Sequence, residues 1–385
     1  MHHYKYLSAV IMFGICPLSA YAANGVADAR GNAMGNTGVT TSDYLLAPFY
    51  NPALTAVYRD RDSVGLLVPA LGANVRDSDE SLSTIDDLQS SIDQFEAAGV
   101  GAATQENINQ LNGYLDDLAD DKPFAVSGGA GIAVALPMNA VSLNFFARGY
   151  AEILADSTIA ANTGNTASDV ETRYQNSYVN MLAFGYSEYG VAVAKLFTLQ
   201  GQQIAIGITP KIQELRTYKE VVTVKDFDLS DYDQSKTSKN AFNLDIGAVW
   251  LIDNFRAGIA AKDLISQEIK TYDDQSSYTL DPQVTVSGGY VTDFLALAID
   301  WDLTKQKRFK GVDDDTQFLR FGVEGNAWGW AQLRAGYEID LESTLDNSIT
   351  AGLGISPGDL VSVDLAANYA GNYQYGLSAN LAFTF

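Results

Sequence analysis

Histidine and cysteine, the side chains most often used for nucleophilic catalysis and metal binding, are almost absent from this 385-residue sequence. His2, His3 and Cys16 are the only ones, and all three lie close to the N-terminus. A chain that loses this segment cannot form a Ser-His-Asp or Cys-His site, nor a zinc or copper site built on imidazole or thiolate. The chemistry that remains is a carboxylate pair, a Ser-Lys dyad or a calcium site made of oxygen ligands.

The first 22 residues have the parts of a secretory leader. Lys5 supplies a positive start, residues 7–18 form an apolar run, and Ala20 to Ala22 read A-x-A, a cleavage site. The apolar run is too short to cross a membrane as a helix. A lipoprotein signal has a small residue before its cysteine, whereas Cys16 follows Ile15, so we expect no lipid there. We predict a signal peptide over residues 1–22 and a mature chain without disulfides.

Carboxylates are abundant, but their spacing does not indicate a catalytic or metal site. Aspartates gather at 313–315 and at 226, 228, 231 and 233, and neither group follows the loop register of an EF-hand. We predict solvated loops, no metal and no cofactor. The net charge of −23 at pH 7 makes nucleic acid a poor partner. Without histidine we expect no hydrolase, and we predict that the chain is not an enzyme and has no catalytic residue.

The last stretch of the chain, Tyr375 to Phe385, has the pattern of a β-strand. Alternate residues from Tyr375 to Phe385 are apolar, and the residues between them are small or polar. Strict period two predicts a β-strand, and about ten residues are enough to cross a bilayer as a tilted strand. A terminal aromatic at the end of such a strand resembles the export signal of bacterial outer-membrane barrels. Taken alone, the segment also fits an edge strand of a soluble sandwich.

The same rhythm recurs along the chain, and its connections alternate between short turns and longer, acidic loops. Outer-membrane barrels sort their loops in this way, with short periplasmic turns and longer outer loops, and have even strand counts. We therefore count residues 174–197, long enough for two strands, as one. The predicted strands cover residues 63–76, 124–137, 140–155, 174–197, 203–221, 240–252, 255–264, 283–291, 294–304, 317–326, 331–341, 348–356, 360–369 and 375–385.

The fold class that follows is an all-β transmembrane barrel of about 14 antiparallel strands in the outer membrane of a Gram-negative bacterium, surrounded by lipid and lipopolysaccharide. The barrel spans residues 61–385. Charged residues on its strands must face the lumen, because a charge on the lipid face is costly. We predict that they form cross-strand ion pairs. These residues are Asp300, Asp302, Arg320, Glu324, Arg334, Glu338, Asp340 and Asp364.

Residues 77–122 interrupt the strand rhythm with helical spacing. Apolar residues recur every three or four positions through residues 81–98, and Gly99 suits the position after a helix end. A second helical run follows Thr104, a suitable N-cap. We predict an α-helical hairpin inserted in the first outer loop. Its acidic face is either a solvated surface over a small local core or a cap over the barrel mouth.

The N-terminal segment, residues 23–60, lacks any clean alternation and carries a recognisable pattern. The runs Ala33 to Val39, Ser42 to Tyr44 and Phe49 to Ala53 resemble the N-terminal hatch of the long-chain fatty-acid (FadL-like) outer-membrane transporter superfamily. They are most similar to its conjugal transfer branch, the TraF-type outer-membrane proteins. The transporters usually continue their Asn-Pro-Ala motif with glycine, where this chain has Leu54.

The resemblance implies that this segment plugs the barrel lumen and that the chain passes a small hydrophobic compound passively. It also leaves open a non-transporting structural or accessory protein, linked to conjugal transfer or secretion and binding a partner of that apparatus. The residues that match the hatch motif are Gly35, Gly38, Asn51, Pro52 and Ala53.

A second expectation concerns the wall of the barrel. Gly128, Gly129, Gly131 and Gly149 fall in the second and third strands, where bulges or close backbone approach are expected. In the transporters that this chain resembles, a kink in the third strand opens a sideways exit. We therefore take Gly149 as the candidate opening. Inward Phe146, Arg148 and Tyr150 would then line an apolar ligand pocket with one cation. The alternative is a glycine that relieves barrel twist.

Overall fold

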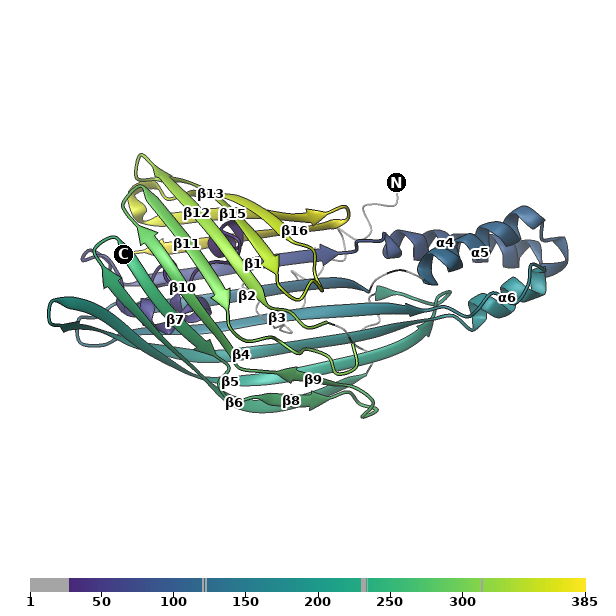
Figure 1. Ribbon diagram of the computed structural model, residues 1–385, viewed down its shortest axis with the longest axis horizontal. Coiled ribbons are helices and arrows are strands. Elements are labelled where there is room, and N and C mark those ends of the chain that lie inside the picture. Colours follow the sequence, from purple (N-terminus) through teal and green to yellow (C-terminus); the bar gives the residue numbers. More distant parts are fainter. Residues whose placement is uncertain (1–27, 120, 122, 230–232, 234, 313) are drawn as a thin grey trace.

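Fourteen strands form one closed antiparallel barrel in the computed structural model, which describes residues 28–119, 121, 123–229, 233, 235–312 and 314–385 (Figure 1). Each strand pairs with its neighbours, and β1 closes the ring on β16, which confirms the predicted fold. The expected leader, residues 1–22, lies outside the described residues. The barrel strands are β1 (Gly65–Arg76), β2 (Phe124–Leu136), β3 (Ser142–Thr158), β4 (Tyr178–Leu199), β5 (Gln202–Thr223), β6 (Lys236–Ile252), β7 (Phe255–Lys262), β10 (Gln283–Val291), β11 (Leu295–Asp302), β12 (Phe318–Ala327), β13 (Ala331–Asp340), β14 (Ser348–Ile355), β15 (Val361–Gly371) and β16 (Gln374–Thr384).

Two regions differ from the sequence prediction. The segment expected over 174–197 is one strand, β4, but Tyr174 belongs to a preceding helix, α6 (Ala167–Gln175). Thr166 caps that helix, and its side chain and that of Asp169 form a reciprocal capping box. The connection between β7 and β10, for which the sequence predicts a loop, contains a separate two-stranded sheet, β8 (Gln267–Lys270) and β9 (Ser277–Leu280).

The outer surface of the barrel is apolar and ends in aromatic residues. Along β11 the outward residues Leu297, Ile299 and Trp301 are exposed while the residues between them are buried. Trp328 and Trp330 stack on each other beside a short turn. A lipid-facing band bounded by aromatic side chains has this pattern. Among the described residues, no helix combines the length and the apolar character needed to span a membrane.

The predicted charges line the inner wall and pair across strands. Arg320 on β12 binds Asp302 on β11 at 2.9 Å and Glu338 on β13 at 2.8 Å. Arg334 on β13 binds Glu324 on β12 at 2.6 Å and also pairs with Asp364 on β15. This confirms the predicted cross-strand ion pairs for six of the eight residues. This side of the inner wall is therefore lined with paired charges. Asp300 instead accepts from the N–H groups of Gly38 and Val39 in the N-terminal segment. Asp340 accepts from the N–H groups of Gln317, Thr344 and Leu345.

The helical hairpin also forms as predicted, with α4 (Ser81–Ala98) and α5 (Gln105–Ala119) joined by η2 (Val100–Ala102). The two helices lie beyond the long-loop end of the barrel, next to α6 (Figure 1). They share an apolar core with the strand ends, and Arg173 of α6 binds Asp116 of α5 at 2.6 Å. Neither hairpin helix contains lysine or arginine. We call α4 and α5 the arm.

Residues 28–58, which we call the hatch, lie inside the barrel. Three short helical segments, α2 (Ala29–Ala33), α3 (Ala47–Tyr50) and η1 (Pro52–Ala56), are buried almost throughout. Segment α2 contacts the strands β13 to β16, whereas η1 contacts β3 to β6. Arg30 of α2 binds Glu324 of the wall at 3.0 Å. The hatch therefore spans the lumen and contacts opposite sides of the wall.

Candidate functional site

The ladder between β4 and β5 is interrupted at one place. Gly190 pairs with Lys211 and Val193 pairs with Ile208, but the residues between them are not paired across the two strands. Pro210 lies in this interval and has no backbone N–H to donate to the ladder. The β4–β5 hydrogen bonding is therefore broken in the middle of two 22-residue strands. A further irregularity lies on β1, where the pairing with both β2 and β16 shifts register between Leu67 and Ala70.

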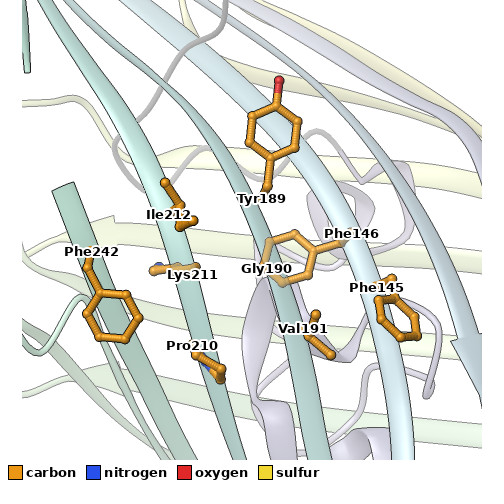
Figure 2. Close-up of a pocket in the computed structure, with 9 residues that line it drawn as sticks. All are labelled: Phe145, Phe146, Tyr189, Gly190, Val191, Pro210, Lys211, Ile212 and Phe242. Carbon is orange, nitrogen blue, oxygen red and sulfur yellow. The ribbon is translucent and has the colours of Figure 1, made fainter. Parts of the chain in front are cut away.

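A depression of about 470 Å³ lies over this interruption on the outer surface of the barrel (Figure 2). Its rim is formed by outward, exposed side chains from β3 to β6, and its floor by inward residues. We call this depression with its floor the wall site. It is lined by Phe145, Phe146, Tyr189, Gly190, Val191, Pro210, Lys211, Ile212 and Phe242. Its lining is almost wholly apolar, as a site open to lipid requires.

One aromatic ring separates the wall site from the hatch. Phe146 is buried, and its ring lies so close to Gly190 that a β-carbon there would be 2.5 Å from Cζ of Phe146. On its other side the same ring meets Phe49 of the hatch edge-on, with the ring centroids 5.8 Å apart. Gly190 is thus the thin part of the wall. Phe146 connects it directly to the plug.

Behind the floor lies a buried ionic cluster centred on Lys211. Its side chain is 0% exposed, and its ammonium lies 2.8 Å from Asp263, 2.9 Å from Asp245 and 3.3 Å from Glu188. Glu188 also pairs with Arg148. Burying several charges is tolerated when they are paired and hydrogen-bonded. Arg148, the cation expected in the ligand pocket, is therefore already neutralised by the protein.

The Asn-Pro-Ala motif of the hatch fits against two glycines of the wall that pair with each other, Gly207 and Gly247. A β-carbon at Gly207 would lie 2.4 Å from the backbone carbon of Pro52, and one at Gly247 would lie 1.9 Å from Oδ1 of Asn51. The side chain of Asn51 also caps η1, because its Oδ1 accepts from the N–H of Ala53 at 3.0 Å.

The two predicted hatch glycines allow other close approaches. Gly35 has φ of +64°, and a β-carbon there would lie 2.8 Å from the carbonyl oxygen of Phe321. At Gly38 the same atom would lie 2.4 Å from the ring of Tyr50. The N–H of Gly38 donates to Asp300 at 2.9 Å, so this wall carboxylate holds the hatch. All five residues of the predicted motif thus lie in the hatch, and each is in close contact with the wall or with another hatch residue.

The residues expected around Gly149 are only partly brought together. Phe146 belongs to the wall site, whereas Tyr150 packs near a different apolar cluster further toward the long-loop end. Strand β3 pairs without a register shift through Gly149 on both sides. The interruption lies instead one strand further along, between β4 and β5. Its sequence signal is Pro210, a proline in the middle of a predicted strand.

The described residues offer no metal centre: none of their histidine, cysteine and carboxylate side chains gather in groups of three or more suited to hold an ion. The three carboxylates near Lys211 have its ammonium at their centre instead.

Comparison with known proteins gives a family and a fold. The family model described as "F plasmid transfer operon, TraF, protein" matches residues 48–302, more than half of the chain. No curated protein matches the sequence.

Solved structures resemble the chain over nearly its whole length. The CymD monoaromatic hydrocarbon channel is 10% identical with a TM-score of 0.54, covering 95% of this chain and 99% of its own. The Ralstonia pickettii toluene transporter TbuX is 10% identical with a TM-score of 0.52, over 93% and 97%. A Pseudomonas aeruginosa FadL homologue is 10% identical with a TM-score of 0.51, over 95% and 99%. At such identities the likeness establishes the shared barrel fold.

Proposed function

The chain belongs to the family of F plasmid transfer operon TraF proteins, and from this premise we propose that it is a plugged outer-membrane channel passing a small hydrophobic compound passively. Its location is the outer membrane of a Gram-negative bacterium, because a closed barrel with an apolar outer surface satisfies every backbone group in lipid. The barrels that it resembles include a monoaromatic hydrocarbon channel and a toluene transporter. The cargo we propose is of that size and polarity.

The wall site is the observation that carries this proposal. An apolar compound is not stabilised beside the ion pairs of β11 to β15, but it is stable in the bilayer. At Gly190 the two environments are separated by the single ring of Phe146, which also contacts the hatch. Movement of the hatch at Phe49 would release this ring. The compound would then pass sideways between β4 and β5, where two residues of each strand are unpaired across the ladder.

The test is uptake of the hydrophobic fluorescent probe N-phenyl-1-naphthylamine by cells that produce the protein, cells that lack it, and cells that produce variants. Val191→Trp places a large ring in the wall site. Its matched control is Val363→Trp, an exposed outward position on β15, far from β4 in strand order. We expect Val191→Trp to reduce uptake to the level of cells without the protein and Val363→Trp to leave it unchanged. Equal uptake by all four strains would exclude the channel.

A variant of the hatch provides a second test of the same proposal. Replacing Asn51 by Ala removes the amide that caps η1 and donates to Val39 at 2.9 Å. A looser hatch should raise uptake of the probe. Uptake unaffected by this change, while Val191→Trp still blocks it, would show that the compound bypasses the hatch.

A non-transporting accessory role in conjugal transfer or secretion is the second candidate, favoured by two features. Ion pairs line one side of the lumen, and the arm, whose helices carry no basic residue, lies outside the barrel. Such a surface suits a partner with a basic face. Photo-cross-linking from Gln110 on α5 that captures one partner, in cells whose probe uptake does not depend on the protein, would favour this role over transport.

We also expect no enzymatic activity. The barrels of similar fold named above are channels and transporters. Hydrolysis of ester substrates by the purified chain would contradict this expectation.

A further inference from the structure

Two loops at the long-loop end of the barrel associate with each other. Strands β8 and β9 come from the β7–β10 loop, and residues 306–312 come from the β11–β12 loop. The N–H of Thr279 donates to the carbonyl of Arg308 at 2.9 Å, and that of Lys310 donates to the carbonyl of Ser277 at 2.8 Å. An isolated bridge joins Tyr278 and Phe309. We call residues 267–280 and 306–312 the lid.

The lid packs against the inner faces of β3, β4 and β5. It contributes Ile269, Tyr278, Leu280 and Phe309 to an apolar cluster whose wall members are Leu154, Phe184, Tyr186 and Leu215. This cluster is separate from the wall site and from the hatch. A second apolar region therefore lies inside the lumen, on the long-loop side of the Lys211 cluster.

At the centre of the cluster, an aromatic ring of the lid lies flat on an aromatic ring of the wall. Tyr278 stacks on Phe184 with the ring centroids 3.5 Å apart and the planes 7° from parallel. Phe309 meets Tyr278 edge-on at 5.0 Å. Tyr278 is 1% exposed. The face of the Phe184 ring is thus fully covered by the flat ring of Tyr278.

The other attachments of the lid to the wall are polar. Thr217 of β5 donates to the carbonyl of Lys270 at 2.8 Å, and Lys219 binds Asp273 at 2.6 Å. Lys239 of β6 donates to the carbonyl of Glu268 at 3.0 Å, and Arg308 pairs with Glu152. The tip of the lid reaches solvent, with Tyr272 63% exposed. The apolar attachment of the lid to the wall is the cluster around Tyr278.

We propose that the wall surface at Phe184 is a binding site for a small flat aromatic molecule, and that Tyr278 is its resident occupant, displaced when such a molecule binds. Beyond its α-carbon, a tyrosine side chain is p-cresol, so free p-cresol can make the same stacking and edge contacts. Phe184, Tyr186, Leu154 and Leu215 stay in place on the wall while β9 moves away. The wall side of the site is lined by apolar side chains, as small-molecule sites are.

This inference rests on the proposed function for its role in transport. Binding at Phe184 would release the lid from the long-loop end, as the first step of entry. The site itself is tested without transport, because lid release is measured directly on the purified protein.

The experiment measures how fast a buried thiol in the lid reacts. Ser277 is buried next to Tyr278, and a Ser277→Cys, Cys16→Ser chain has a single thiol. The purified full chain in detergent is treated with a polar methanethiosulfonate reagent while p-cresol is titrated. We expect the rate to rise saturably by roughly two- to tenfold, the equilibrium equivalent of one aromatic contact. The saturated analogue 4-methylcyclohexanol, which cannot stack, should leave the rate unchanged.

Two further variants make the result specific. With Phe184→Leu the flat wall face is gone, so the response to p-cresol should disappear even though basal labelling rises. With Tyr278→Leu the resident ring is absent, and labelling should be fast and independent of p-cresol. Heat-modifiable mobility on gels verifies that each barrel has folded.

Equal responses to p-cresol and 4-methylcyclohexanol, or a p-cresol response that survives Phe184→Leu, would overturn the site. The outcome is distinguishable from that of the channel proposal. A saturable p-cresol response in a protein that gives cells no probe uptake would leave the site standing and remove its role in transport. Uptake that Val191→Trp blocks, with no p-cresol response, would overturn the site alone.

Discussion

Asn51 of the hatch and Gly247 of β6 are in direct contact, and a β-carbon on Gly247 would lie 1.9 Å from Oδ1 of Asn51. The neighbouring glycine, Gly207 of β5, stands in the same relation to Pro52. The hatch motif and this pair of wall glycines therefore form one interface. The glycines are required by close approach, since neither has a positive φ.

Replacing Gly207 by Ala tests this interface. The new methyl group would meet the backbone of Pro52 and Ala53, which cannot move aside as a flexible side chain can. We expect the hatch to lose about 1–3 kcal/mol of stability, the usual cost of overpacking, and to become sensitive to protease in the folded barrel. Gly288→Ala is the control, because a β-carbon there meets nothing within 4 Å. Equal protease resistance of the two variants would contradict the close contact.

Replacing Lys211 by Met tests the buried ionic cluster. The change leaves Glu188, Asp245 and Asp263 in a buried site without their central cation. Removing one partner of a buried ion pair costs about 3–5 kcal/mol, so the unfolding midpoint in guanidinium should fall markedly. Lys195→Met, on the exposed outer part of β4, is the matched control. If both variants unfold at the midpoint of the unaltered protein, the cluster contributes no net stability.

The alternation of side chains is enough to predict the barrel but not the sites inside it. Period two on β11 to β13 identifies Asp302, Arg320 and Glu338 as lumen residues, and they pair as expected. Alternation also predicts which residues share a face, whatever the loops do. This is why the predicted strand count is correct although α6, β8 and β9 are missed.

The wall site and the lid depend on contacts between residues far apart in the sequence. Phe146 contacts Phe49, and Phe184 contacts Tyr278, and no local pattern links either pair. The resemblance to the transporters points to Gly149, whereas the ladder is interrupted at Pro210. A proline in a central strand is visible in the sequence, and it is the local signal that could have identified the interruption.

The lid should loosen as the pH rises from about 4 to about 7. Burial, opposed by the nearby Arg308, raises the pKa of the Asp314 carboxyl to about 7, and both of its oxygens accept from the N–H of Phe309. In an open lid its pKa would return toward about 3.9. The closed state therefore binds the proton more tightly. Its contribution to lid stability is full below about pH 4 and is lost as the pH rises through about 7.

The measurement is the labelling rate of Ser277→Cys with and without Asp314→Asn, compared at each pH so that the pH dependence of the thiol cancels. The asparagine side chain of the variant cannot ionise, so the ratio of the two rates should be constant below about pH 4, change between about pH 4 and about pH 7, and level off above that. A ratio that stays flat from about pH 4 to about pH 7 would show that Asp314 does not control the lid.

Phe146 and Phe145 are neighbours on β3 with opposite expected effects on passage through the wall. Phe146 points inward, fills the space at Gly190 and contacts Phe49, whereas Phe145 points outward and only rims the depression. Phe146→Ala removes the one ring between the bilayer and the hatch, at a stability cost of about 3–5 kcal/mol. Uptake of N-phenyl-1-naphthylamine by cells should rise several-fold above that of cells with the unaltered protein.

Phe145→Ala is the control and leaves this barrier in place. Uptake by cells with this variant should match that of cells with the unaltered protein, or fall slightly as the rim loses apolar surface. Because the two positions are adjacent and chemically identical, equal uptake by both variants would mean that the compound does not cross between β4 and β5.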